Sequence, residues 1–151
     1  METPDDLAMP FLLAEAFRGL ADAVHADLEA AGYPGVTERH GFAMQAIGEG
    51  CSGAELGQRL GVSKQAAAKT AASLEALGLI ERAPDPLDRR ASVLSPTERG
   101  RGMLRASAAS FRRHVAEWRA RSGDAAMDAT LRTLALAEPG RRGPVDAAGR
   151  G

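Results

Sequence analysis

Apolar residues recur every three or four positions near the start of the chain, a spacing typical of an amphipathic helix. The repeat predicts a helix over about residues 7–31 and consists of Leu13, Phe17, Leu20, Val24 and Leu28. Residues 32–37 (GYPGVT) interrupt it with glycine and proline. Thr37 is placed to cap a second helix, whose apolar residues are Phe42, Ala43, Met44 and Ile47.

Two short helical patterns joined by a turn follow. Ser52 and Glu55 form an S-x-x-E capping box, which predicts a helix start ahead of Leu56 and Leu60. Gly61 suits the left-handed backbone that ends many helices. We expect Val62 to fill the corner and Ser63 to cap a second helix that extends to about Leu77. This arrangement is typical of a helix-turn-helix.

Residues 79–95 have short apolar ends around a loop rich in Pro, Asp and Arg, which predicts a two-stranded hairpin. A long helix then begins at Thr97, or at Ser95 with Pro96 in its first turn. Its apolar seam steps by four and three positions and comprises Leu104, Ala108, Phe111, Val115 and Trp118. Residues 121–126 (RSGDAA) break this pattern, and a last helix carries Met127, Leu131 and Leu134. The composition of residues 138–151 predicts a disordered tail.

The net charge of −1 hides an uneven distribution. Residues 1–55 hold two arginines against ten acidic residues, whereas residues 56–105 hold nine basic and five acidic residues. A basic middle segment favours an anionic partner, although solvation of helix faces explains such charges as well.

The exposed side of the helix that begins after Ser63 has a composition suited to DNA. At 100° per residue, Ala67, Thr70, Ala71, Leu74 and Leu77 share the face that packs on the domain. The opposite face carries Lys64, Gln65, Ala68, Lys69 and Ala72. Glutamine bonds adenine, lysine reaches guanine or phosphate, and alanine contacts the thymine methyl in a major groove.

The hairpin tip adds Asp88, Arg89 and Arg90. Arginine suits phosphate and the negative potential of a narrow minor groove. Asp88 is placed to hold the tip by bonding either the turn backbone or the guanidinium group of Arg90. Together with the helix-turn-helix, this hairpin is best interpreted as a DNA-binding wing.

Residues 52–100 resemble the DNA-binding lobe of MarR-type (multiple antibiotic resistance regulator) winged helix-turn-helix transcription factors. The matching motifs are Ser63-Lys64-Gln65, Leu74-Glu75, Gly78-Leu79, Arg82, Asp88-x-Arg90 and Thr97-x-x-Gly100. The resemblance implies a mostly α fold with a small β-hairpin wing, in one domain spanning 1–151. Within it, residues 37–96 form the winged-helix lobe, and residues 7–31 and 97–137 form dimerisation helices. Pro96 departs from the family, which usually has leucine there, and leaves hairpin length and wing angle open.

The resemblance further implies a homodimer that binds a pseudo-palindromic operator in double-stranded DNA, most often as a repressor. The single cysteine suits a location in the reducing cytoplasm. The residues carried over to DNA contacts are Ser63, Lys64, Gln65, Ala68, Lys69, Asp88, Arg89 and Arg90. Helical stripes larger than a small lobe can cover point to the dimer interface, which comprises Phe17, Leu20, Val24, Leu104, Phe111, Val115, Trp118, Leu131 and Leu134.

Many relatives release DNA when a small aromatic effector binds between the dimerisation helices and the lobe. Tyr33, His40 and Arg112 are candidates for such a cleft, although structural roles are favoured for each. Cys51, the only cysteine, precedes a helix start that would lower a thiol pKa, so a redox-sensing regulator is an alternative. A further alternative is a winged-helix protein-interaction module that does not read DNA.

Several function classes find no support in the sequence. The three histidines and Cys51 lack metal-ligand spacing, and no phosphate loop, nucleophile elbow or zinc-protease motif is present. No segment has the length of a membrane span, and a single cysteine forms no internal disulfide. We therefore expect no enzyme activity, no cofactor and no metal site.

Overall fold

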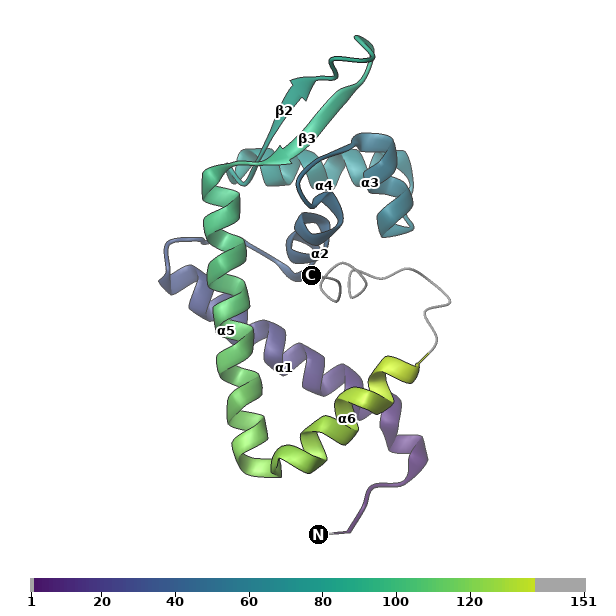
Figure 1. Ribbon diagram of the computed structural model, residues 1–151, viewed down its shortest axis with the longest axis vertical. Coiled ribbons are helices and arrows are strands. Elements are labelled where there is room, and N and C mark those ends of the chain that lie inside the picture. Colours follow the sequence, from purple (N-terminus) through teal and green to yellow (C-terminus); the bar gives the residue numbers. More distant parts are fainter. Residues whose placement is uncertain (1, 138–151) are drawn as a thin grey trace.

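The structure, a computed structural model, describes residues 2–137 (Figure 1). The elements in chain order are a 3-10 turn η1 (Asp6–Ala8), α1 (Met9–Ala30), α2 (Glu38–Ile47), β1 (Cys51–Ser52), α3 (Gly53–Leu60), α4 (Lys64–Ala76), β2 (Ile80–Pro84), β3 (Ser92–Pro96), α5 (Glu98–Ser122) and α6 (Asp124–Leu136). The predicted mostly helical winged-helix fold is confirmed. The tail predicted from residue 138 onward lies outside the described residues. Among the helices of residues 2–137, none is long and apolar enough to cross a membrane.

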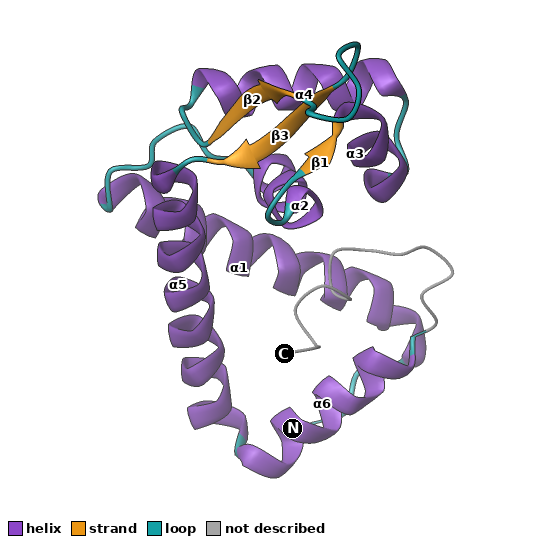
Figure 2. Cartoon of the chain, turned by 45° about the horizontal axis from the view of Figure 1, so that its top comes forward, coloured by secondary structure: helices purple, strands orange, loops and turns teal. Residues whose placement is uncertain are grey.

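A small antiparallel sheet lies against the helices of the lobe. Its strand order is β1-β3-β2, and Figure 2 shows it beside α2, α3 and α4. Strands β2 and β3 pair from Ile80 opposite Pro96 to Pro84 opposite Ser92. The predicted two-stranded hairpin is therefore present but belongs to a three-stranded sheet, because β1 adds Cys51 opposite Leu94.

The core of the chain lies where α2, α3, α4 and the sheet meet the inner ends of α1 and α5. Its fully buried side chains include Met44, Leu56, Leu74 and Leu94. Val24 and Leu28 of α1 and Met103 of α5 extend the same cluster. The apolar stripes of the terminal helices thus contribute partly to the core of a single chain.

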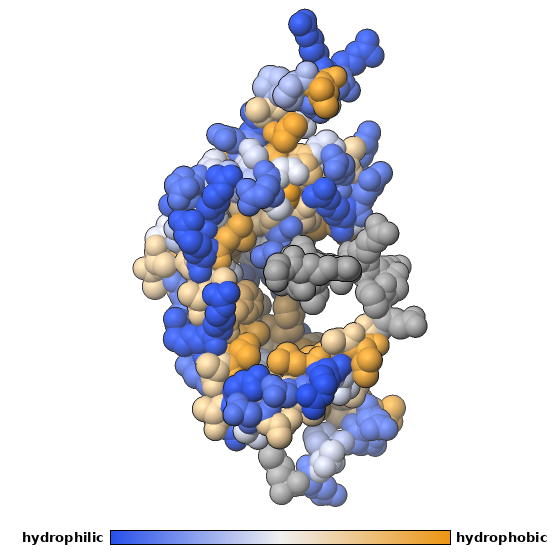
Figure 3. Space-filling view, viewed as in Figure 1, coloured by the Kyte–Doolittle hydropathy of each residue, from blue (hydrophilic) through white to orange (hydrophobic). Residues whose placement is uncertain are grey.

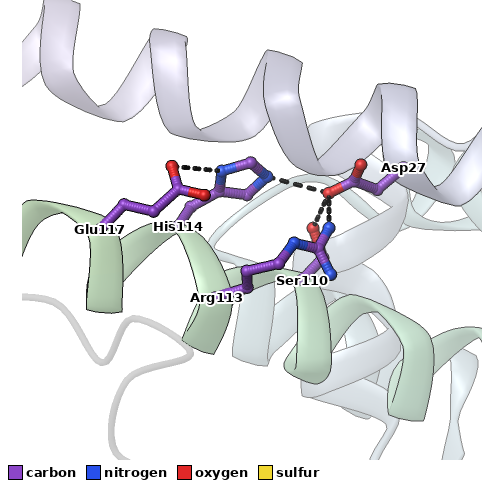
Figure 4. Close-up of polar contacts among 5 residues, drawn as sticks. All are labelled: Asp27, Ser110, Arg113, His114 and Glu117. Carbon is purple, nitrogen blue, oxygen red and sulfur yellow. Dashed lines mark hydrogen bonds and ion pairs between the residues drawn. The ribbon is translucent and has the colours of Figure 1, made fainter.

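A polar cluster joins α1 to α5 (Figure 4). One carboxylate oxygen of Asp27 accepts hydrogen bonds from Ser110 Oγ at 2.5 Å and His114 Nε2 at 2.9 Å and also pairs with Arg113. On its other side, the His114 ring lies 3.7 Å from Glu117. The hydrogen bonds from Ser110 and His114, followed by the charge of Arg113, lower the pKa of Asp27. The cluster fixes the crossing of the two helices.

Two helix boundaries differ from the prediction. The first helix begins with the turn η1, because Pro10 favours the first turn of an α-helix and sets the start of α1 at Met9. The predicted break at residues 121–126 is limited to Gly123, whose φ of 86° only glycine adopts readily. Helices α5 and α6 consequently meet at a sharp corner, and α1, α5 and α6 form three sides of a triangle below the lobe (Figure 2).

Candidate nucleic-acid interface

Local hydrogen bonds set the two helices of the helix-turn-helix. The predicted capping box is present: Ser52 Oγ accepts from Glu55 N at 3.1 Å, and Glu55 Oε1 accepts from Ser52 N at 3.2 Å. The hydrogen bond that the Ser52 amide donates to the carboxylate is the largest cause that lowers the pKa of Glu55. Gly61 ends α3 in the left-handed region with φ of 65°, and Ser63 Oγ caps α4 by accepting from Ala66 N at 3.1 Å. The turn therefore orients α4 through backbone geometry and caps.

The corner differs from the prediction in one respect. The side chain of Val62 is 44% exposed instead of filling the space between the helices. Its backbone makes the contact, since Val62 N donates to Gly57 O at 3.0 Å. Gly57 is buried because the chain at residues 62–63 and Ala67 lie directly against it. The prediction for Val62 was therefore wrong, and the close helix approach at Gly57 explains why.

Helix α4 has the two faces that its sequence predicts. Ala67, Thr70, Ala71 and Leu74 are buried, and Thr70 Oγ1 satisfies its hydrogen-bonding capacity within the helix by donating to Ala66 O. The residues on the other side are all exposed, namely Lys64, Gln65, Ala68, Lys69 and Ala72. Short alanine side chains between the lysines leave a slim surface that a DNA groove is wide enough to admit.

An arginine ties the wing to the end of α4. Arg82 of β2 donates from Nε to Glu75 Oε1 at 2.8 Å and from a terminal nitrogen to Ser92 Oγ at 3.2 Å. These bonds connect α4, β2 and β3, and they therefore stabilise the angle between the wing and α4. The motif match includes Arg82, but its partners depend on tertiary structure and are not visible in the sequence.

The wing tip is held by its aspartates. Asp88 Oδ1 accepts from the backbone N–H of Arg90 at 3.0 Å, so of the two predicted options the structure shows the bond to the turn backbone. Arg89 and Arg90 are exposed. Within residues 2–137, neither guanidinium group has an ion pair or a hydrogen bond to a side chain. Both are therefore available to an external anion.

Pro96 does not shorten the hairpin. It is the last residue of β3, opposite Ile80, and its ring is buried. Proline thus supplies an apolar anchor at the position where the family usually has leucine. Its carbonyl accepts a hydrogen bond from Arg101 at 3.0 Å, which connects the strand to α5.

The structure divides the candidate dimerisation residues into three groups. Val24 is only 2% exposed and packs in the core of its own chain, so it is not available to a second protomer. Leu20, Leu104, Val115 and Trp118 are half-buried, whereas Phe17, Phe111, Leu131 and Leu134 are exposed. Sequence reasoning missed the apolar residues of the first turns, which are Leu7, Met9, Phe11 and Leu12. They are exposed because the part of α1 that precedes Leu20 extends away from the core. This is evident only from the structure.

A cavity of about 410 Å³ lies between α1, α2 and α5. Its lining is mostly apolar and includes Phe17, Phe42 and Phe111, of which the first two stack with centroids 6.0 Å apart. The lining does not include Tyr33, His40 or Arg112. The ring of Tyr33 packs under Arg99, and Arg112 is exposed on α5.

His40 has a structural role at the start of α2. Its Nδ1 lies 3.0 Å from Thr37 N, and its Nε2 lies 2.8 Å from Ser73 Oγ on α4. Burial lowers the pKa of His40 below its ordinary value of 6.5. The histidine thus takes the place that glutamate holds in an ordinary capping box and connects α2 to α4.

Cys51 does not have the environment of a reactive thiol. It is buried in β1, and this burial raises the pKa of its thiol. The adjacent helix start had suggested a lowered pKa instead. The redox alternative loses its physical basis. Among the described residues there is also no group of three or more side chains able to hold a metal ion.

Comparison with known proteins connects this geometry to a family. Residues 42–91, which span α2 to the wing tip, match the model of the MarR family. No curated protein matches the chain in sequence.

Solved structures share the fold over most of the chain. RV1404 from Mycobacterium tuberculosis superposes with a TM-score of 0.72 at 20% identity, covering 99% of both chains. YusO from Bacillus subtilis gives 0.68 at 22% identity, covering 91% of this chain and all of its own. FabT from Streptococcus pneumoniae, solved in complex with DNA, gives 0.69 at 20% identity, covering 86% of this chain and 94% of its own. The resemblance to the MarR-type winged helix-turn-helix family is therefore confirmed, by sequence over residues 42–91 and by fold over most of the chain.

Proposed function

We propose that the chain is a sequence-specific, DNA-binding transcriptional regulator that acts as a homodimeric repressor. The observation that carries this proposal is the placement of two basic surfaces, the outer face of α4 and the wing tip, at the end of the molecule opposite α6 (Figure 1). Regulators of the matched family are DNA-binding transcription factors without enzyme activity, so we propose no reaction.

In this proposal α4 enters a major groove with its first turns. Gln65 and Ala68 face base edges, while Ser63, Lys64 and Lys69 bind phosphates or guanine. The wing reaches the neighbouring minor groove, where Arg90 enters the region of negative potential, Asp88 holds its backbone and Arg89 binds the phosphate rim. The solved complex of FabT with DNA supports this class of partner.

The second protomer is proposed to cover the exposed apolar surface of the terminal helices. This surface comprises Leu7, Met9, Phe11, Leu12, Leu13, Leu131, Leu134 and Leu136. Figure 3 shows hydrophobic residues along one edge of α6, next to hydrophilic ones, in the lower part of the molecule. Exposed large apolar side chains in this number favour an interaction site on these helices. A two-fold axis there would place two copies of α4 on half-sites of a pseudo-palindromic operator, about one helical turn of DNA apart.

The cavity between α1, α2 and α5 is a candidate site for an effector that releases the repressor. Its volume of about 410 Å³ and its phenylalanines suit a small aromatic molecule. The site lies between the terminal helices and the lobe, so an occupant that changes their spacing would also change the distance between the two copies of α4.

The experiment that tests the regulator proposal starts from random duplex DNA. Sequences retained by the protein are selected, and binding is then measured by fluorescence anisotropy at several salt concentrations beside a scrambled duplex. We expect a pseudo-palindromic selected site, preferred over the scrambled duplex and bound less tightly as salt rises. Lys69→Ala should weaken binding to both duplexes and lower the salt slope by about one unit per half-site. Equal binding to both duplexes by wild type would contradict sequence-specific recognition.

A further inference from the structure

The wing tip exposes an apolar side chain that the proposed dimer does not account for. Leu87 is 96% exposed, the highest value for a large apolar residue within residues 2–137. The next most exposed, Leu136 at 81%, lies in α6, and Leu7 and Phe11 lie at the start of the chain, where a second protomer is proposed to bind. Leu87 lies in the loop between β2 and β3, at the opposite end of the molecule (Figure 1).

The backbone of the tip keeps Leu87 in this exposed position. Asp85 Oδ1 accepts from Leu87 N at 2.8 Å, and Asp85 N donates to Ala91 O at 3.1 Å, which closes the loop. Ala91 N donates in turn to Asp88 O at 3.1 Å. Pro84 and Pro86 restrict the backbone on either side of Asp85. An ordered loop of this kind presents Leu87 outward at little further entropic cost on binding.

The neighbours of Leu87 define the chemistry of what it meets. Arg89 and Arg90 supply cationic groups within three residues of it, while both aspartates of the tip are engaged by backbone N–H groups. The tip thus combines one exposed apolar side chain with two cationic side chains that suit an anion. A DNA minor groove offers the complement, because phosphates form its rims and deoxyribose C–H groups its walls. Leucine and other apolar side chains are known to enter this groove in many DNA-binding proteins.

The base at the floor of the groove decides how closely an apolar side chain approaches. A·T pairs present only acceptors there, whereas guanine adds a protruding 2-amino group. We propose that Leu87 packs into the minor groove beside Arg90 and makes the wing discriminate against guanine in the sequence that flanks the half-site. This inference rests on the proposed DNA-binding function and assigns one source of specificity to the wing.

The test uses the selected operator with three versions of its flanks. These carry A·T pairs, G·C pairs, or inosine·C pairs, which lack the 2-amino group of guanine. Wild type should bind the A·T and inosine·C duplexes alike and the G·C duplex about tenfold more weakly, the amount expected if each wing loses part of the apolar contact of one leucine. Leu87→Ser should bind the A·T duplex about tenfold more weakly than wild type and discriminate less between inosine and guanine. Leu87→Met, the matched apolar control, should behave as wild type.

Two results would overturn the proposal. Leu87→Ser could retain both the affinity and the discrimination of wild type, or wild type could bind G·C flanks as tightly as inosine·C flanks. A wild-type protein that binds none of the duplexes would overturn the regulator proposal as well, so the two failures are distinguishable. Urea unfolding of each variant provides the folding control, and equal midpoints are expected because Leu87 contacts little of its own chain.

Discussion

Gly100, three residues after Thr97 in the first turn of α5, lies too close to its neighbours to be replaced by a larger residue. Thr97 Oγ1 accepts from Gly100 N at 3.0 Å and donates to Gly78 O at 2.6 Å, and Thr97 N donates to Leu79 O at 3.0 Å. These bonds hold the first turn of α5 against the chain just before β2. A Cβ atom at residue 100 would collide with the carbonyl oxygen of Leu79 and lie 3.1 Å from Met44 Cε in the core.

The expected cost of Gly100→Ala follows from these contacts. Backbone cannot yield as a flexible side chain does, and forcing extra volume into a packed site costs about 1–3 kcal/mol. Displacing the Leu79 carbonyl also weakens its hydrogen bond with Thr97, worth about 1 kcal/mol. Alanine recovers up to about 1 kcal/mol of helix propensity over glycine. We therefore expect the free energy of unfolding to fall by about 1–3 kcal/mol.

Urea unfolding followed by circular dichroism, at one fixed protomer concentration, measures this change. Gly41→Ala is the matched control, because Gly41 lies within α2 and a Cβ atom there meets nothing within 4 Å. The control should be unchanged or more stable by up to about 1 kcal/mol. If Gly100→Ala were as stable as Gly41→Ala, the close approach of α5 to Leu79 would not constrain the fold.

Three further predictions concern assembly, pH and oxidation. Phe11→Ser, at a side chain 73% exposed in the single chain, should weaken the dimer roughly a hundredfold in sedimentation, because the apolar contact of Phe11 is lost twice across a two-fold interface. Leu87→Ser should leave assembly unchanged. Equal weakening of the dimer by both variants would contradict the proposed interface. Because burial lowers the pKa of His40, the unfolded chain binds more protons than the folded chain near pH 6, and the free energy of unfolding should fall as pH drops below 6.5. His40→Gln should lose this dependence on pH. If the variant kept the slope of wild type, His40 would not be its source. Peroxide should leave DNA binding intact because the Cys51 thiol is buried with a raised pKa; loss of binding that Cys51→Ser prevents would be the contrary result.

Short-range patterns predicted much of the lobe. The caps at Ser52, Ser63 and Thr97 are present as expected, because each depends on residues within one helical turn. The two faces of α4 follow from its helical period alone. His40 was missed as a capping residue because the usual partner at that position is glutamate or glutamine.

Long-range contacts were not predictable in the same way. The two-residue strand β1 is too short for an alternating pattern, and its pairing with β3 depends on the complete fold. The bonds of Asp27 to α5 join residues more than eighty positions apart. The helical stripe of α1 also could not show where burial in its own chain ends, which is why Val24 was assigned to the dimer interface and Leu12 was overlooked.

The most direct test of the DNA-binding account compares two arginine variants on the selected operator. Arg90→Ala removes the proposed minor-groove contact, and Arg112→Ala removes the same charge from an exposed position on α5, outside the lobe. The account predicts that Arg90→Ala weakens binding at least tenfold, since each of two wings loses a contact of about 1 kcal/mol, while Arg112→Ala stays within about twofold of wild type. Unchanged affinity of Arg90→Ala, or an equal loss in both variants, would contradict it.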